Sequence, residues 1–345
     1  AVLLGLTPDL AKSQTAVSQE LDNLLEQGRE LVEAKNWASA IEVFQRAASM
    51  DSQNAKIFSG IGFAYAQQGK FEEAVNAYRQ AIALDSTNAD FEFALGFSLA
   101  NLGNHEAAAA AYRRATELDN QNVNAFLGLG TVLARQGQLD PALTAFQRAA
   151  QLDRRNAEAQ ESIGLVLLRQ GRTEAGIEAL QRAVELNARR GSAFVGLGIG
   201  FLNQGNSSAA LNAFNRAVRL DPNNAKLHFQ IGSIFEETGD LRAAIAAYQR
   251  AVNLNRDLVE AQIALADAVL ENQEIMRAIL AYREVVRLAP ENARAFFKLG
   301  VALRERERNI EAIEALERAR SLFEQQGQSE DAKKAEAALN EIKAN

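Results

Sequence analysis

The chain has 345 residues, with 37 Lys and Arg against 44 Asp and Glu, and it contains no cysteine. The lack of cysteine excludes disulfides, thiolate catalysis, zinc fingers and iron–sulfur clusters. The net charge of −7 argues against a nucleic-acid-binding protein, whose surface needs clustered positive charge facing phosphates. With 48% apolar residues and four prolines, the composition favours a helical globular chain.

The first segment, residues 1–20, opens with an apolar run from Ala1 to Leu6 and has no initiator methionine. The run is shorter than the roughly 20 apolar residues that a membrane-spanning helix needs. We interpret it as the remnant of a secretory signal or N-terminal anchor ending near Ala11, or else as a frayed or docked helix. A remnant implies an exported or membrane-associated protein, with a soluble body and a membrane tether upstream of residue 1. Otherwise we expect a cytoplasmic protein.

Glycines recur along the chain with a period of 34 residues. One series consists of Gly69, Gly103, Gly137, Gly171, Gly205 and Gly239. A second series precedes it by seven residues and consists of Gly28, Gly62, Gly96, Gly130, Gly164, Gly198, Gly232 and Gly300, with Ala266 in the gap. Counted from Leu21, the period gives nine repeats: 21–54, 55–88, 89–122, 123–156, 157–190, 191–224, 225–258, 259–292 and 293–326. Numbered within a repeat, the two series occupy positions 15 and 8.

Each repeat has the pattern of two helices joined by a turn. Apolar residues at positions 7 and 11 share one face of a first helix. Alanine at positions 20 and 27, with an aromatic residue at position 24, marks a second helix. A glycine at position 8 lets the two helices approach closely, and the glycine at position 15 permits the left-handed conformation that ends a helix. Asparagine at position 34 is placed to cap the next first helix, and Asp140-Pro141 is typical of the start of a second helix.

These motifs, bulky–Leu-Gly–bulky in the first helix and Ala–aromatic–Ala in the second, resemble those of the tetratricopeptide repeat (TPR) family over residues 21–326. The resemblance implies an all-α fold, a right-handed superhelical α-solenoid of helix–turn–helix repeats. Residues 327–345 follow the ninth repeat, and we expect them to form a capping helix that begins near Ser329 and covers the last apolar face.

The sequence has no recognisable arrangement for chemistry. It lacks metal-binding His spacings and a phosphate-binding Gly-Lys-Ser/Thr loop, and its glycines occupy helix-contact and helix-end positions. We interpret His105, in the turn before a second helix, and His228 as surface or packing residues. The expectation is a protein that is not an enzyme, with no catalytic residue, no cofactor and no metal.

The resemblance also indicates where a partner binds. In the TPR family the first helices line the concave face, and positions 2, 5, 9, 12 and 13 point into its groove. The Lys and Asn pair with which some relatives grip a C-terminal carboxylate is absent, and the groove is apolar instead. Position 6 is small in the middle repeats, as in Gly60 and Gly128, and we expect this to leave space between the bulky side chains. The candidate partner-binding residues are Phe63, Phe93, Phe97, Leu127, Thr131, Leu165, Leu168, Val195, Ile199, Leu202 and Phe229.

The function that follows is a protein–protein interaction scaffold or adaptor that holds an apolar or amphipathic segment of a protein or peptide partner. Two alternatives are a membrane-tethered assembly factor for a bioenergetic or photosynthetic complex, and the substrate-selecting arm of a larger enzyme whose catalytic domain is absent. A further alternative for the groove residues is packing against the next repeat, or cover by the N-terminal segment.

Overall fold

The computed structural model describes residues 8–344, with side chains for residues 18–343. The chain divides into two compact parts, an N-terminal part, Ala1–Ala188, and a C-terminal part, Arg189–Asn345, and each is described by itself. The apolar run Ala1–Leu6, on which the signal or anchor hypothesis depends, lies outside the described residues. Among the residues described, no helix combines the length and apolarity that crossing a membrane requires.

The described chain is helical throughout and contains no strand. The N-terminal part contains α1 Pro8–Glu33, α2 Trp37–Met50, α3 Ala55–Gln67, α4 Phe71–Leu84, α5 Ala89–Asn101, α6 His105–Leu118, α7 Val123–Arg135, α8 Leu139–Leu152, α9 Ala157–Arg169 and α10 Thr173–Leu186. The C-terminal part contains α11 Gly191–Asn203, α12 Ser207–Leu220, α13 Ala225–Glu237, α14 Leu241–Leu254, α15 Val259–Glu271, α16 Ile275–Leu288, α17 Ala293–Glu305, α18 Asn309–Gln325 and α19 Ser329–Ala344.

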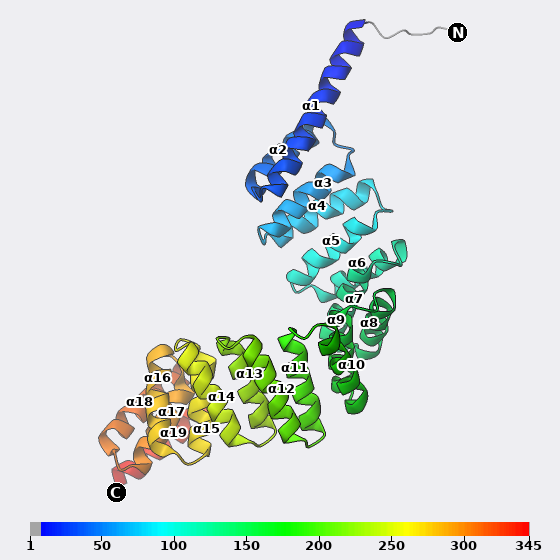
Figure 1. Ribbon diagram of the computed structural model, residues 1–345. Helices are drawn as coiled ribbons and strands as arrows, with labels where there is room; N and C mark the ends of the chain where they lie inside the picture. The colour runs from blue at the N-terminus through cyan, green and yellow to red at the C-terminus, as the bar shows by residue number, and fades with distance from the viewer. Residues whose placement is uncertain (1–7, 345) are drawn as a thin grey trace. The chain divides into compact units, whose positions relative to one another are not determined.

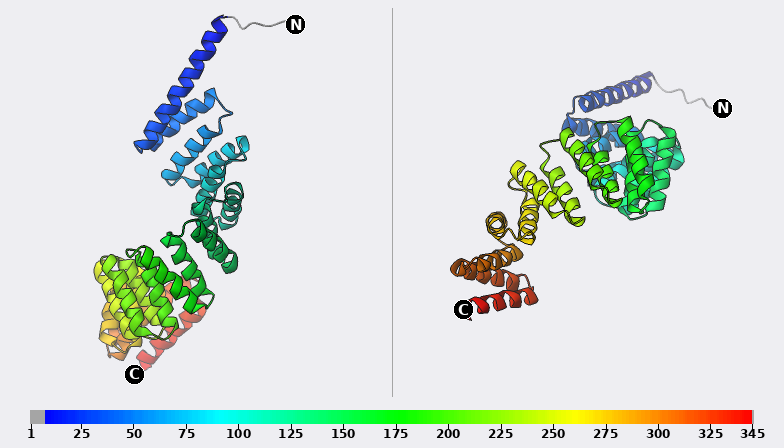
Figure 2. Two further views of the ribbon diagram at one scale, coloured as in Figure 1. Left: turned by 45° about the vertical axis from the view of Figure 1, so that its right-hand side comes forward. Right: turned by 60° about the horizontal axis from the view of Figure 1, so that its bottom comes forward.

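Within each part the helices pack in pairs, and each pair packs against the next (Figures 1 and 2). The first helix of a pair is odd-numbered and the second is even-numbered. The odd-numbered helices of neighbouring pairs also touch, as in α1 with α3, α3 with α5 and α13 with α15. This arrangement confirms the prediction of an all-α solenoid of helix–turn–helix pairs.

The first helices end in the left-handed turn expected at position 15. In the turn after α3, Gly69 has φ +74°, and the N–H of Lys70 donates to the carbonyl of Tyr65 at 3.0 Å. This hydrogen bond satisfies a carbonyl that the end of the helix would otherwise leave without a partner. The three repeats without glycine at this position form the same turn, with φ +57° at Lys35, +63° at Gln273 and +57° at Glu307.

The helix starts agree with the expectation in one respect and differ in another. All six asparagines at position 34 cap the following first helix, and Asn156 for example accepts the N–H of Ala159 at 2.9 Å. The prediction of Asp140 as N-cap and Pro141 as first helical residue was wrong, because α8 begins two residues earlier, at Leu139, and its N-cap is Gln138. His105 likewise is the first residue of α6 and does not belong to the preceding turn.

The two helices of a pair touch at the glycine of position 8. A Cβ placed on Gly198 would lie 2.3 Å from the ring of Phe214, the aromatic residue at position 24 of the same repeat. The same ring contact recurs in most repeats, with leucine in place of the ring at Leu180 and Leu316. The helices therefore approach to a distance that only glycine permits, except at Ala266 of the eighth repeat.

The small residues at position 6 have a different role from the one expected. A Cβ on Gly128 would lie 2.6 Å from the ring of Tyr112, and one on Gly60 would lie 3.0 Å from the ring of Phe44. Both rings belong to the preceding repeat. The small residue thus admits the aromatic ring of its neighbour, and the space predicted between the bulky groove residues is filled by that ring.

The last helix, α19, packs against α18 and touches α17. Its apolar side chains Ala335, Leu339 and Ile342 are buried, while Lys333 and Asn340 face solvent. That residues 327–345 serve as a cap for the array stays a prediction.

Gly164→Ala should lower the free energy of unfolding by about 1–3 kcal/mol, because overpacked interior sites cost that much. The added Cβ would lie 2.5 Å from Leu180 Cγ and 2.9 Å from the backbone oxygen of Gly176, which cannot move aside easily. Gly191→Ala is the matched control, since its Cβ would meet only the Ala217 oxygen at 3.9 Å. Urea denaturation followed by circular dichroism measures both, and equal stability of the two variants would contradict the packing described.

Gln273→Gly should stabilise the chain by about 1 kcal/mol, because a side chain in the left-handed region costs roughly 1–2 kcal/mol that glycine avoids. The reverse change, Gly171→Gln, should destabilise it by a similar amount. No atom lies within 4 Å of a Cβ placed on Gly171, so conformation alone is tested there. Thermal melts of the two variants should shift in opposite directions, and a common direction would refute this explanation.

Candidate partner-binding groove

The first helices α1, α3 and α5 of the N-terminal part line a groove of about 650 Å³. Consecutive members of this set touch one another, so their exposed side chains form one surface. Its lining comes from repeat positions 2, 5, 6, 9, 12 and 13, which include those that the TPR resemblance implied, and from positions 24 and 34. The lining residues are Leu25, Arg29, Val32, Glu33, Phe44, Asn54, Lys56, Ser59, Gly60, Phe63, Tyr78, Asp90, Phe93 and Ala94.

Two phenylalanines at position 9 are unusually exposed for apolar residues of their size. Phe63 is 40% exposed and Phe97 is 45% exposed. Each is supported from one side by an aromatic residue that opens a second helix of the preceding repeat. The ring centroids are 6.0 Å apart for Trp37 and Phe63 and 6.3 Å apart for Phe71 and Phe97, both in edge-to-face geometry. Such pairs hold the rings in place while one face of each stays available for binding.

The floor of the groove is also aromatic. Phe93 is half-buried, and its ring lies 5.8 Å from that of Tyr112. Phe44 and Tyr78 come from second helices and line the groove, and the ring of Phe44 lies against Gly60 at position 6. Burial raises the pKa of the Tyr112 hydroxyl to about 12, and it raises the pKa of Tyr78 further. Both rings therefore stay neutral at physiological pH, and the floor carries no charge.

The rim of the groove is charged and mixed in sign. Arg29 on α1 and Lys56 on α3 contribute positive charge, while Glu33 and Asp90 contribute negative charge. All four side chains are exposed, and Arg29 also forms an exposed ion pair with Glu26 at 3.2 Å. An apolar floor between charged rims suits a segment that is apolar on one side and polar on the other.

The remaining candidate residues of the N-terminal part do not extend this aromatic surface. Leu127 and Leu168 are each 8% exposed, and they contribute to packing more than to a surface. Thr131 is exposed, but its hydroxyl donates to the carbonyl of Leu127 at 2.8 Å. Leu165 is half-buried. The accessible aromatic groove is therefore concentrated at α1, α3 and α5.

The other four candidates, Val195, Ile199, Leu202 and Phe229, lie in the C-terminal part and are half-buried. Val195, Leu202 and Phe229 pack against the core of that part, and the ring of Phe229 lies 5.8 Å from that of Tyr248. These four residues are therefore a separate set from Phe63, Phe93 and Phe97.

The sequence analysis missed the contribution of the helix starts. Trp37 and Phe71 occupy position 17, one residue after the cap of a second helix, and neither was counted as a groove residue. The sequence does contain a signal for these contacts. An aromatic residue at position 17 of one repeat is followed, 26 residues later, by an aromatic residue at position 9 of the next repeat, and this combination occurs only within the first three repeats.

No group of three or more His, Asp or Glu able to hold a metal ion occurs among the described residues. His228 is buried, and burial lowers the pKa of its imidazole. The groove of α1, α3 and α5 can bind a ligand through apolar contacts with its floor and ion pairs at its rim.

Family models match most of the array. The model described as the C-terminal domain of cilia and flagella-associated protein 70 matches residues 62–238, just over half of the chain. Two tetratricopeptide-repeat models match residues 25–89 and 263–330, and residues 225–258. A TPR repeat-containing protein of Picosynechococcus sp. is 35% identical over 60 residues, which are 17% of this chain and 16% of that protein. The match thus spans about a sixth of the relative's length.

Solved structures share the fold at low sequence identity. A tetratricopeptide repeat protein from Parabacteroides merdae has a TM-score of 0.60 at 16% identity, over 73% of this chain and 99% of that one. The APC/C hetero-tetramer Cut9–Hcn1 gives a TM-score of 0.55 at 19% identity, over 70% of this chain and 48% of that one. PilF of Pseudomonas aeruginosa gives a TM-score of 0.50 at 20% identity, over 62% of this chain and 97% of that one. At these identities the likeness concerns the fold alone.

Phe63→Ser should shift the fluorescence emission of Trp37, the single tryptophan, to longer wavelength, because the indole loses the ring that covers one side of it. Far-ultraviolet circular dichroism should stay the same, since Phe63 is exposed. Phe97→Ser is the control, because Phe97 contacts Phe71 and not Trp37. Unchanged emission in Phe63→Ser would show that the Trp37–Phe63 contact is not formed in solution.

Proposed function

The chain belongs to the tetratricopeptide-repeat family, and from this premise we propose that it is a scaffold that captures an apolar or amphipathic segment of a partner protein at α1, α3 and α5. The observation that carries the proposal is a pair of exposed rings: Phe63, which lines the groove with the floor ring of Phe93, and Phe97, which lies four residues after Phe93 on α5 at the edge of that lining. The chain performs no catalytic step in this proposal.

The reason is the free energy of exposed apolar surface. Burying apolar area contributes roughly 25 cal/mol per Å², so two large rings held at the surface favour any ligand that covers them. Phe63 and Phe97 are held by Trp37 and Phe71, and a bound segment therefore needs to order few side chains of the scaffold. Pre-arranged aromatic anchors of this kind dominate the binding energy of many interfaces.

The charged rim favours an amphipathic segment over a wholly apolar one. Arg29 on α1 and Lys56 on α3 carry positive charge, while Glu33 on α1 and Asp90 on α5 carry negative charge. A helix with an apolar stripe would cover the rings and keep polar side chains level with these four residues. Charges of both signs at the rim also restrict the orientation in which such a helix is accepted.

The experiment selects ligands with the protein itself. A library of random 16-residue peptides displayed on phage is enriched on the full chain, and selected peptides are measured by fluorescence anisotropy. We expect peptides with apolar residues at helical spacing, and we expect Phe63→Ser, Phe97→Ser to weaken their binding at least tenfold. Each lost anchor costs about 1–2 kcal/mol or more, which supports this magnitude.

Leu102→Ser provides the control, because Leu102 is an exposed leucine of similar apolar area that lies in the turn after α5 and does not line the groove. Its peptide binding should equal that of the original chain. Full-strength binding by the double phenylalanine variant, with its helical signal intact, would place the binding surface elsewhere.

A further inference from the structure

Three of the four second helices of the C-terminal part, α12, α14 and α16, carry a strongly one-sided charge, whereas the fourth, α18, carries two arginines and four glutamates. The helices α12, α14 and α16 together contain seven arginines and one glutamate. The five second helices of the N-terminal part contain six arginines and nine acidic residues. The contrast is local, since the whole chain has a net charge of −7. The arginines are Arg216, Arg219, Arg242, Arg250, Arg277, Arg283 and Arg287.

Six of these seven arginines are exposed, whereas Arg283 is half-buried and pairs with Glu311 of α18. Arg216 on α12 and Arg250 on α14 occupy the same repeat position, and both are exposed. On α14, Arg242 and Arg250 are eight residues apart, a little over two helical turns, so they lie on the same side of the helix. The opposite side of that helix carries the buried residues Ala244, Tyr248 and Ala251.

The exposed side of α16 carries two apolar residues in addition to its arginines. Met276 is 46% exposed and Leu280 is 61% exposed, and the two are one helical turn apart. In the other repeats the position of Leu280 holds Glu, Asn, Thr or Ala, and that of Met276 is polar in repeats two to seven. The pair therefore departs from the pattern of the array at the place where the arginines gather.

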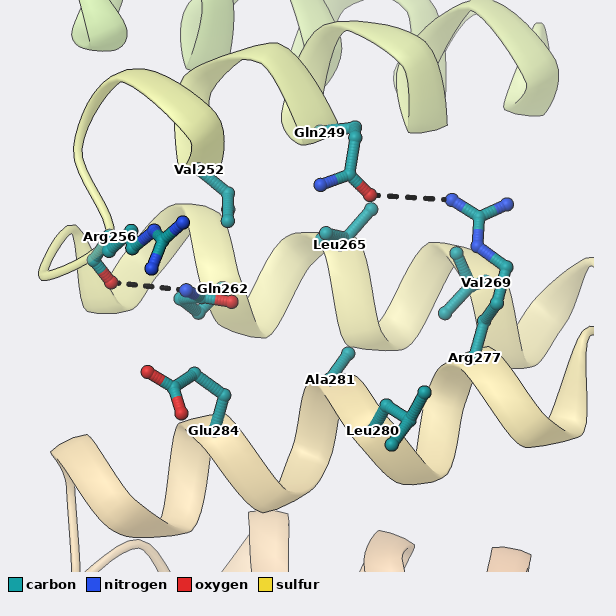
Figure 3. A pocket seen from close by; sticks show the side chains of 10 residues that line it. All are labelled: Gln249, Val252, Arg256, Gln262, Leu265, Val269, Arg277, Leu280, Ala281 and Glu284. Carbon is teal, nitrogen blue, oxygen red and sulfur yellow. Dashed lines mark hydrogen bonds between the residues drawn. The ribbon is translucent and has the colours of Figure 1, made fainter.

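A recess lies between α14 and α16 beside Leu280 (Figure 3). Its volume is about 390 Å³, and its apolar floor includes Val252, Leu265 and Val269. Arg256 and Arg277 stand at opposite ends of it, and Arg277 donates to Gln249 at 3.5 Å. The recess can receive one bulky apolar side chain from a ligand that also meets the arginines.

Only some of these arginines are neutralised within the chain. Arg277 pairs with Glu274, and Arg287 pairs with Glu284 at 2.6 Å. Arg242 and Arg250 have no ion pair among the described side chains, 18–343. Arg216 and Arg219 on α12 likewise have no ion pair among these side chains, whereas Arg283, the remaining arginine of α16, pairs with Glu311. The unpaired positive charge therefore lies on α12 and α14, and α14 also lines the recess through Gln249 and Val252.

We propose that the outer face of α12, α14 and α16 docks an acidic amphipathic helix of a partner protein, at a surface separate from the groove of α1, α3 and α5. Two apolar residues one turn apart in the ligand cover Leu280 and enter the recess. Carboxylates that flank them pair with Arg242 and Arg250. Charge complementarity selects the acidic ligand and raises its rate of association.

The recess and the apolar residues distinguish this ligand from other polyanions. A nucleic-acid backbone would meet the arginines but would leave Met276 and Leu280 uncovered. An anionic membrane would cover both residues but would leave the recess below Leu280 unfilled. A helix with apolar and acidic side chains satisfies all three features.

The test uses the full chain and a fluorescein-labelled 18-residue helical peptide with two leucines four residues apart, flanked by glutamates. Anisotropy at 50 mM salt should show saturable binding that weakens at least fivefold at 300 mM salt, because exposed ion pairs are screened. Arg250→Glu and Leu280→Ser should each weaken binding at least fivefold. The same peptide with lysine in place of glutamate should not bind.

Two control variants separate this site from others. Arg46→Glu changes the arginine at the same repeat position on α2, and Phe97→Ser changes the groove, so neither should alter binding of the acidic peptide. The proposal would be overturned if the unchanged chain did not bind the acidic peptide. It would also be overturned if Arg250→Glu and Leu280→Ser bound the peptide as strongly as the unchanged chain does. Tighter binding of a 20-base-pair DNA duplex or of phosphatidylglycerol vesicles than of the peptide would overturn it as well. So would salt-sensitive self-association of the chain in sedimentation velocity, because a second copy of the chain would then cover this face.

Discussion

The close contact between a glycine of the first helix and a large side chain of the second is the interaction on which this structure depends. At Gly198 a Cβ would lie 2.3 Å from the Phe214 ring, and at Gly130 it would lie 2.6 Å from the ring of Phe146. The ring takes the volume that a side chain would occupy, so the two helices of a pair approach closely at this point in repeat after repeat. At Gly60 and Gly128 a small residue of the following first helix receives the ring of the preceding repeat, which links those pairs to one another. Each repeat therefore needs its neighbours to bury its apolar face.

This packing also determines which side chains are left for function. Positions 8, 20, 24 and 27 are used by the contact, whereas positions 5 and 9 of the first helices and the outer positions of the second helices are not. In the N-terminal part, positions 5 and 9 of the first helices carry exposed or half-buried aromatic rings. In the C-terminal part, the outer positions of the second helices carry arginine, methionine and leucine. The two surfaces lie on different helices of the repeat, so a change in one need not disturb the other.

The periodic features could be predicted from the sequence, and the irregular ones could not. Glycine at position 15 and asparagine at position 34 act through backbone geometry close to them in the chain, and both predictions were confirmed by φ +75° at Gly171 and by the caps. Gln273 forms the same turn without glycine, because the surrounding helices impose the conformation. The use of Gly60 and Gly128 by rings of the preceding repeat depends on contacts between repeats, which spacing alone does not reveal. The burial of Leu127 and Leu168 follows from the same contacts. The role of Trp37 and Phe71 could not be predicted from the TPR resemblance, because they start second helices, whereas the groove positions that it implies all lie on first helices.

The central claim, that α1, α3 and α5 form the groove that receives a partner segment, is tested most directly by amide hydrogen exchange of the full chain with and without a selected peptide. The account predicts slower exchange on binding in α1, α3 and α5, together with a change in the emission of Trp37 at the groove edge. Slower exchange confined to second helices such as α2 and α4, with unchanged Trp37 emission, would contradict it.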